Sequence, residues 1–499
     1  MCEKKIQSGD KSGSKMTNIT PETRIMMMRS TDGRNSCRRQ ILAALAVSLG
    51  PFAAGLSKGY MSPAIASLQE TRSHVGAFTV SDQQASWIAS LSLLGAFIGG
   101  ILGGLAMRLG RRTVLIATAL PYTLAWLATA LSTSVHMISA ASFCAGMLIS
   151  FINMTTQVYV TEIAVPEIRG CLSSVLKILS QIGILISFSI GAYLNWYQLA
   201  LMIAAAPILL FFALFFIPET PSSLLLRGRE QEAEESLQWL RGPEADIRQE
   251  LATIRTNILA SKLYNDGHTR LKALMSKRMT RPVLITCGLM FFQRFTGASL
   301  FNFYAVKMFK KTLRSMNPHG GAIATSVAQL LASCLSGMLI DNVGRLPLLM
   351  ISGVMMSIAL AGFGSYAYYE EVFRNTTDIV HAEPGSYDWI PLLCVLTFTI
   401  AFSLGISPIS SLLVGELFPL EYRSTGSALA TSFSHLCGFV NVKTAADFQD
   451  HIGLYGLFWM YAGISVLCLL FVVLFVPETK GREIDEMDPK YVESLCINR

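Results

Sequence analysis

The sequence predicts an all-α membrane protein in which twelve transmembrane helices form two six-helix bundles. Of its 499 residues, 52% are hydrophobic and 15% are charged, whereas soluble proteins carry about 25% charged residues. Apolar runs of about 20 residues, the length that a helix needs to cross a bilayer, recur along most of the chain. Motifs of the first half also return in the second half in the same order. These observations argue against a soluble enzyme, a disordered protein, a disulfide scaffold and a nucleic-acid-binding protein.

The chain begins with a polar, basic segment, residues 1–39, which holds nine Lys or Arg against four Asp or Glu. It lacks the apolar run of a secretory signal peptide, so we expect a disordered tail. Its positive charge favours the cytosolic side of the membrane. The first six spans, within an N-terminal bundle at 40–225, are expected at about 41–62, 86–107, 113–132, 137–159, 172–194 and 197–217. The first span contains one charged residue, Lys58, which we expect near its outer end.

A charged insert, residues 226–281, separates the two sets of spans. Its helical periodicity, as in residues 234–241, predicts amphipathic helices on the cytosolic face. The second six spans, within a C-terminal bundle at 282–476, are expected at about 282–305, 321–340, 347–368, 389–413, 425–446 and 454–476. Twelve spans return the chain to its starting side, so the polar tail 477–499 is also expected in the cytosol. We therefore expect a multi-pass protein of the plasma membrane with both termini cytosolic.

The loop charges agree with this topology at all but one place. The long loop 369–388 falls outside the cell and is net acidic, and it contains a glycosylation sequon at Asn375. The exception is a basic cluster at residues 307–314, which lies at an end expected outside. Nothing in the sequence accounts for this cluster.

The sequence predicts no metal, cofactor or catalytic site. Its ten cysteines include no CxxC pair and no cluster with histidine, so neither a zinc site nor a disulfide framework is indicated. Most cysteines lie within apolar runs and are expected to be small packing residues. Outside the repeated motifs there is no nucleophile–base set and no pair of carboxylates, so an enzyme is not expected.

Three motifs occur once in each half, at corresponding spans. A glutamate followed by an arginine seven residues later comes after the fourth and the tenth span, Pro-Glu-Thr ends the sixth and the twelfth, and Gly-Arg follows the second and the eighth. Their charged residues are Arg111, Arg112, Glu162, Arg169 and Glu219 in the first half, and Asp341, Arg345, Glu416, Arg423 and Glu478 in the second. Such a repeat indicates a duplicated six-helix unit.

The order and spacing of these motifs resemble the sugar-porter branch of the major facilitator superfamily. The segments 194–200, 217–221, 236–242, 414–419 and 475–481 carry the resemblance, which is greatest to the facilitated trehalose transporters of insects. It implies a site between two halves that opens to each side of the membrane in turn. It also implies that the charged residues of the repeated motifs form two cytosolic ion-pair clusters, which latch that side closed and break when it opens.

The resemblance also indicates a substrate pocket in which this sequence departs from the branch. The second of two glutamines in the seventh span is replaced by Arg294, an asparagine by Ser299, and two tryptophans by Ser411 and His435. The candidate substrate-binding residues are Gln293, Arg294, Ser299, Tyr304, Lys177, Gln181, Ser411, Ser434 and His435. Amides and hydroxyls among them offer donors and acceptors to sugar hydroxyls.

The sequence therefore predicts first a facilitative, uncoupled sugar carrier, with trehalose or a hexose as substrate. Proton-coupled relatives commonly carry an Asp in the first span, and this chain has none there. The charges of Lys177 and Arg294 leave open a carrier of small organic anions or acidic sugars. The missing tryptophans leave open a non-transporting sensor. The expected partners are a small sugar and the lipid bilayer, with no nucleic acid, no cofactor and no obligate protein partner.

Overall fold

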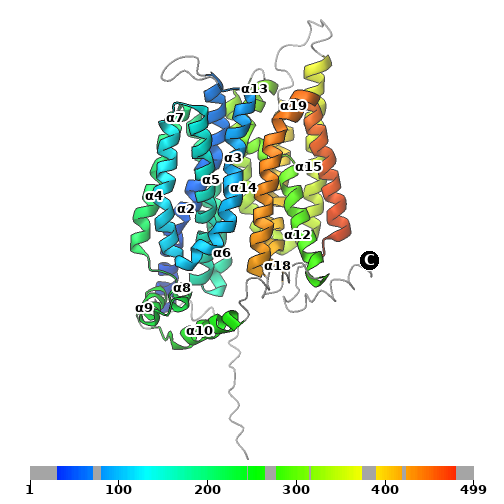
Figure 1. The fold of residues 1–499 in the computed structure, drawn as a ribbon. Coiled ribbons are helices and arrows are strands. Elements are labelled where there is room, and N and C mark those ends of the chain that lie inside the picture. Colours follow the sequence, from blue (N-terminus) through cyan, green and yellow to red (C-terminus); the bar gives the residue numbers. More distant parts are fainter. Residues whose placement is uncertain are drawn as a thin grey trace, which may run out of the picture.

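The computed structural model describes residues 31–70, 80–243, 245–263, 277–313, 316–373, 389–418 and 423–478, which are helical almost throughout (Figure 1). The first half contains α2 (Thr31–Glu70), α3 (Asp82–Ala106), α4 (Arg111–Ala130), α5 (Val135–Ile163), α6 (Pro166–Gly191) and α7 (Trp196–Ala213). Three shorter helices follow, α8 (Pro221–Leu226), α9 (Glu230–Arg241) and α10 (Arg248–Leu263). They lie together at one end of the bundle, below it in Figure 1.

The second half repeats this pattern with three interruptions. It contains α12 (Lys277–Phe295), α13 (Ala298–Thr312), α14 (Pro318–Val343), α15 (Arg345–Tyr368), α17 (Trp389–Leu404), α18 (Ile406–Glu416) and α19 (Arg423–Phe475). The expected seventh span is broken at Gly297, where φ is +88°, a conformation that glycine adopts without strain. The tenth is broken at Gly405, where a Cβ atom would lie 2.3 Å from the Cβ of Ser352. The third interruption is Gly453 within α19, with φ 72° and ψ 171°.

Twelve membrane spans follow from these helices, as predicted. Eleven helical stretches of the described chain are long and apolar enough to cross a membrane. The last of them, Thr425–Phe475, has 51 residues, more than twice the ~20 that one crossing needs. Because its backbone is not helical at Gly453, this stretch supplies two spans.

The surface and the interior of the bundle both fit a lipid environment. Large apolar side chains such as Leu124, Ile358 and Leu474 are more than 60% exposed, as expected where hydrocarbon replaces water. Between helices, small residues permit close approach: a Cβ at Gly146 would lie 1.9 Å from the carbonyl oxygen of Ser92. Such contacts are typical of membrane helix packing.

Each half has its own apolar core, and the halves meet along equivalent helices. One core is built mainly from residues 43–240 and the other mainly from residues 285–476. Between the halves, α3 packs on α19, α6 on α14 and α2 on α13. These are the second span with the eleventh, the fifth with the eighth and the first with the seventh, which is the reciprocal pairing that a duplicated unit produces.

The described part of the charged insert is largely helical. On α9 the buried residues are Ala233, Ser236, Leu237 and Leu240, a spacing that places them on one face. Arg241, at the end of α9, donates from Nη1 to the carbonyl oxygen of Ile163 at 2.9 Å. The insert therefore contacts the end of α5.

The first helix begins earlier than expected. The segment 31–39, predicted as part of a disordered tail, is helical, and α2 starts at Thr31. Arg39 explains part of this, because its Nη1 donates to the carbonyl oxygen of Trp239 at 3.0 Å and its guanidinium lies 5.9 Å from the ring centroid of that residue. Gln40 also accepts a hydrogen bond from Val165 N at 3.1 Å. Residues 1–30 and 479–499 lie outside the described part of the chain.

Candidate functional site

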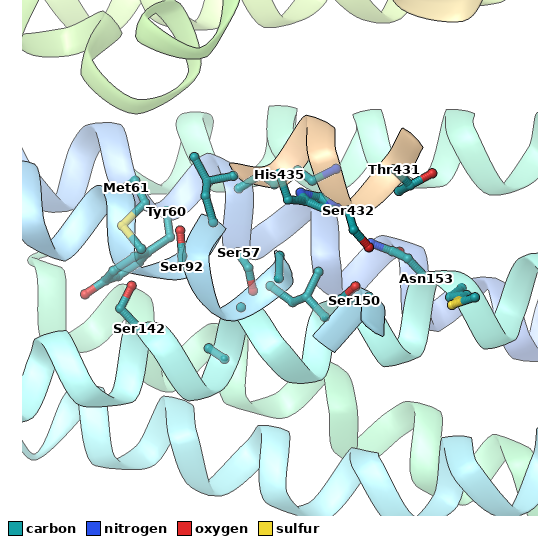
Figure 2. A pocket seen from close by; sticks show the side chains of 18 of the residues that line it. Ser57, Tyr60, Met61, Ser92, Ser142, Ser150, Asn153, Thr431, Ser432 and His435 are labelled. Carbon is teal, nitrogen blue, oxygen red and sulfur yellow. The ribbon is translucent and has the colours of Figure 1, made fainter. Parts of the chain in front are cut away.

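A cavity of about 530 Å³ lies between the two halves. Its walls come from α2, α3, α4 and α5 of the first half and from α12, α13 and α19 of the second. Figure 2 shows Thr431, Ser432 and His435 on α19 facing a wall of first-half helices that carries Ser57, Ser92 and Ser150. The volume is in the range of small-molecule sites, about 300–1,000 Å³.

Most polar groups of the cavity are hydroxyls and amides. On α5, Ser142, Ser150, Asn153 and Gln157 line it, and their spacings of 8, 11 and 15 residues from Ser142 place them on one face of the helix. Such groups both donate and accept hydrogen bonds, as sugar hydroxyls require. The apolar part of the lining includes the aromatic rings of Tyr60, Trp126 and Phe303.

Two polar atoms of the lining residues are buried without a hydrogen-bond partner in the described part of the chain. They are Tyr60 Oη and His435 Nδ1. The Tyr60 and Trp126 rings meet edge to face with their centroids 4.8 Å apart. A buried polar group without a partner costs about 1–3 kcal/mol, so these atoms favour a ligand that brings hydroxyl groups into the cavity.

Two basic side chains also line the cavity, Lys58 from α2 and Arg294 from α12. Lys58 was expected near the outer end of its span. Because the helical stretch extends from Cys37 to Gln69, its midpoint is residue 53, and Lys58 lies five residues, or about 8 Å, away. Among the residues that line the cavity there is no Asp or Glu.

Arg294 is held by polar residues of the eleventh and twelfth spans. Its Nε donates to Ser434 Oγ at 2.8 Å. Its carbonyl oxygen accepts from Asn441 Nδ2 at 2.8 Å, and Asn441 Oδ1 accepts from the hydroxyl of Tyr461 at 2.8 Å. Hydrogen bonds therefore hold both the side chain and the backbone of Arg294 in place.

Of the nine candidate substrate-binding residues, two line the cavity: Arg294 and His435. Ser434 lies behind Arg294 and holds it. The other six lie elsewhere in this conformation: Gln293, Ser299, Tyr304, Lys177, Gln181 and Ser411. Gln293 donates to the carbonyl oxygen of Ser407 at 3.0 Å, and Ser411 donates to that of Pro408 at 2.8 Å. Substrate contact by these six residues stays a prediction.

The lining residues that the sequence reasoning missed are chiefly those of the first half. The one-face spacing of Ser142, Ser150, Asn153 and Gln157 was visible in the sequence. Lys58 was visible as the only charge of its span. The α19 residues Thr431 and Ser432 gave no comparable signal, because polar residues are spread widely around that stretch.

In the first half, the repeated motifs form one cluster at the end of the bundle where α8–α10 lie. Arg111 Nη2 and Glu162 Oε1 form an ion pair at 2.7 Å between α4 and α5. The Glu219 carboxylate accepts from the backbone N–H groups of Arg111, Arg112 and Thr113, at 2.9, 3.0 and 3.2 Å. Glu219 therefore caps the N-terminus of α4.

The second half repeats this arrangement. Arg345 Nη2 and Glu416 Oε1 form an ion pair at 3.2 Å. The Glu478 carboxylate accepts from the backbone N–H groups of Arg345 and Leu346, at 3.1 and 2.8 Å, and so caps α15. Gly110 and Gly344, which precede the capped helices, have φ values of +103° and +104°. The matching geometry supports the duplication read from the sequence.

The ion pairs and caps described above connect helices of the same half. Arg169, predicted in the first cluster, donates from Nη2 to the carbonyl oxygen of Ala164 at 3.4 Å. The side chains of Asp341 and Arg423 and the whole of Asn375 lie outside what the structure describes. A latch function of these residues stays a prediction.

The opposite end of the molecule is closed by contacts between the halves, which we call the outer contact. Lys307 Nζ on α13 lies 2.6 Å from Asp82 Oδ1 on α3. Lys443 on α19 donates to Gln83 Oε1 at 3.0 Å and lies 4.9 Å from the ring centroid of Trp87. Lys307 belongs to the basic cluster that the sequence left unexplained, and Asp82 provides its counter-ion.

The cavity extends away from the outer contact. Its lining includes Met107, Gln157 and Val158, near the ends of α3 and α5. These residues lie toward the end of the bundle that carries the ion-pair clusters. The structure thus shows a conformation in which the halves are joined at one end and separated by a cavity toward the other.

Comparisons with known proteins agree with this architecture. The profile of the family described as sugar (and other) transporter matches residues 43–491. The facilitated trehalose transporter Tret1 of Apis mellifera ligustica is 37% identical over 91% of this chain and 88% of that protein. The Tret1 of Bombyx mori is 36% identical over 90% of this chain and 86% of that protein.

Solved structures share the fold at lower identity. The xylose transporter XylE from E. coli, in a partially occluded inward open conformation, gives a TM-score of 0.73 at 21% identity. The match covers 89% of this chain and all of that one. The same transporter bound to 6-bromo-6-deoxy-D-glucose gives 0.72 at 22% identity, with 91% and 100% covered. With the family profile matched over almost the whole chain, this protein belongs to the sugar transporter family of membrane carriers with the major facilitator fold.

Proposed function

We propose that this protein is a facilitative sugar carrier of the plasma membrane that works by alternating access, with trehalose or a hexose as substrate. The observation that carries the proposal is the cavity between the halves. Its lining combines hydroxyls, amides and aromatic rings with two buried polar atoms that lack a partner among the described residues. Two relatives more than 35% identical are named facilitated trehalose transporters, which supports a disaccharide as the first substrate to test.

The orientation in the membrane is part of the proposal. We place α8–α10 and both termini in the cytosol, because Arg108, Arg111 and Arg112 lie at that end of the bundle and short cytosolic loops are enriched in basic residues. The cavity then faces the cytosol, and the outer contact closes the extracellular side.

The test uses the purified full-length protein in liposomes with labelled trehalose and glucose. We expect saturable uptake of at least one sugar that is inhibited by the same sugar unlabelled. A matched blocked carrier is Gly100→Trp, because Gly100 lines the cavity and a Cβ there would already lie 2.9 Å from Ser432 Oγ. The large side chain fills the cavity, so uptake by this variant should fall to background.

Uptake that is absent for both sugars, in vesicles with folded and correctly inserted protein, would contradict the proposal. The non-transporting sensor would then be the function to examine. Uptake that Gly100→Trp leaves unchanged would show instead that the sugar takes a route outside this cavity.

A further inference from the structure

The central cavity carries more positive charge than a neutral sugar requires. Lys58 and Arg294 enter it from opposite halves, and His435 lines it from the second half. The residues that line it include no carboxylate. Walls of low dielectric constant and a single sign of charge concentrate ions of the opposite sign.

No ion pair within the described part of the chain neutralises either side chain. The ion pairs found within the described residues involve neither Lys58 nor Arg294. Both side chains line the same cavity, so their positive charges repel each other. The side chain of Lys58 is exposed, although the residue lies near the middle of its span. Its exposed surface therefore faces the cavity. A charge at this depth is costly and indicates a functional site.

Arg294 also has free donors in a fixed position. A guanidinium has five N–H donors, and among the described residues the structure shows an acceptor, Ser434 Oγ, for the Nε alone. Gly438, one turn after Ser434, leaves room for the arginine: a Cβ there would lie 3.5 Å from Arg294 Cδ. The planar guanidinium is therefore held in place with its two Nη groups available, which suits the paired oxygens of a carboxylate, sulfate or phosphate.

His435 adds a third group of the same kind. Its Nδ1 is buried without a hydrogen-bond partner among the described residues, and the imidazole lines the same cavity as Arg294 and Lys58. An anion between the three side chains would reduce the repulsion between the cations and supply the missing partner of the imidazole.

We propose that Lys58, Arg294 and His435 form an oxyanion-binding subsite in the central cavity. The oxyanion is either the acidic group of a transported sugar, such as a hexuronate, or a small free anion that binds beside a neutral sugar. The second form rests on the proposed sugar carriage, whereas binding of an anion does not. A carrier for neutral sugar alone would have no use for two unneutralised cations at the centre of the membrane.

Binding is tested first, on the full-length protein in detergent at constant ionic strength. The probes are sodium sulfate and sodium glucuronate, with glucose as the uncharged comparison, and the readout is the midpoint of thermal unfolding. Both anions should raise the midpoint of the unchanged protein. Arg294→Gln and Lys58→Gln should each weaken anion affinity about tenfold or more, the loss expected for one charge-assisted hydrogen bond.

Lys311→Gln is the matched control. Lys311 is a lysine of α13 that does not line the central cavity. Its replacement removes the same charge and should leave anion affinity unchanged. If neither anion stabilises the protein, or if Lys311→Gln weakens binding as much as Lys58→Gln does, the subsite does not exist.

Transport then separates the two sources of the anion. Uptake of labelled glucuronate that Arg294→Gln abolishes would identify an acidic sugar as substrate. If sulfate binds but glucuronate does not move, a free anion occupies the subsite, and sulfate should change the uptake of neutral sugar in the unchanged protein but not in Arg294→Gln. Anion binding without any sugar uptake would contradict the proposed sugar carriage and leave the subsite intact. Sugar uptake without anion binding would support the proposed sugar carriage and contradict the subsite.

Discussion

At the scale of single residues, one carboxylate in each half caps the N-terminus of a membrane-spanning helix. Glu219 and Glu478 accept backbone N–H groups at the N-termini of α4 and α15. The first N–H groups of a helix have no partner within it, and the helix dipole favours a negative charge there. The Pro-Glu-Thr motif, visible twice in the sequence, therefore has a clear structural reason in both halves.

Replacement of Glu219 by alanine should destabilise the protein strongly. Three backbone N–H groups would lose their acceptor. A hydrogen bond to a charged group contributes about 1.5–3 kcal/mol. We expect a loss of at least ~2 kcal/mol in the free energy of unfolding, measured as a lower thermal midpoint in detergent. Glu232→Ala is the control, because Glu232 forms an ion pair with Arg229 in which both side chains are about half exposed, and such pairs contribute about 0–1 kcal/mol. Equal effects of the two changes would contradict the capping role.

Residues of the candidate site were harder to predict than those of the motifs. Gln293 was expected in the pocket, but its amide holds the carbonyl oxygen of Ser407. Lys58 was placed too far out, because an apolar run ends earlier than the helix that contains it. Which face of a helix meets a cavity depends on its rotation and on its neighbours, and hydropathy reports neither. Arg294 and His435 were found because a charge or an imidazole within an apolar run is conspicuous on its own.

At the scale of elements, close pairs of helices depend on glycine. A Cβ at Gly146 on α5 would lie 1.9 Å from the carbonyl oxygen of Ser92 on α3, whereas a Cβ at Gly104 on α3 would meet nothing within 4 Å. Gly146→Ala should therefore force α3 and α5 apart and lower the thermal midpoint. Gly104→Ala should leave it unchanged or raise it slightly, since alanine is favoured over glycine within a helix by about 1 kcal/mol. Similar effects of both changes would show that the two helices pack less tightly than the structure indicates.

The outer contact joins two elements, α13 and α3. In the orientation proposed above, it should hold the extracellular side closed. Lys307→Gln removes the ion pair between α13 and α3, so the halves should separate more often at that end. The reporter is a cysteine at Met61, which lines the cavity, labelled on intact cells by a thiol reagent that does not cross membranes. Labelling should be several-fold faster with Lys307→Gln than with the lysine in place.

Charge reversal provides the control for this prediction. Asp82→Lys alone should speed labelling as Lys307→Gln does, because it places two cations against each other. The double change Asp82→Lys with Lys307→Asp restores an ion pair of opposite direction and should slow labelling again. If the double variant labels as fast as the single one, the ion pair does not control opening.

At the scale of the whole molecule, much of the fold could be predicted from the sequence. Length and apolarity determine the number of spans, since a helix must cross the hydrocarbon with its backbone groups satisfied. The repeated motifs indicated that the two halves are copies of one six-helix unit. The breaks at Gly297 and Gly405 were missed, because the apolar character of the seventh and tenth spans continues through both glycines. The outer contact was missed because it joins side chains more than 200 residues apart.

The two halves and their shared cavity also predict how the carrier uses energy. In alternating access the halves rock around a site near the midplane, and a proton-coupled carrier needs a group in that site which gains and loses a proton during the cycle. The lining of this cavity holds no carboxylate, whereas proton-coupled members of the branch commonly carry an Asp in the first span. Labelled neutral sugar should therefore reach the same concentration on both sides of a liposome membrane, with or without a proton gradient. Unlabelled sugar loaded inside the liposomes should speed the entry of labelled sugar. A carrier that has bound sugar inside can return its site to the outside without a bound ion. Accumulation of neutral sugar that requires a proton gradient would show that another residue carries the proton and would contradict facilitated diffusion.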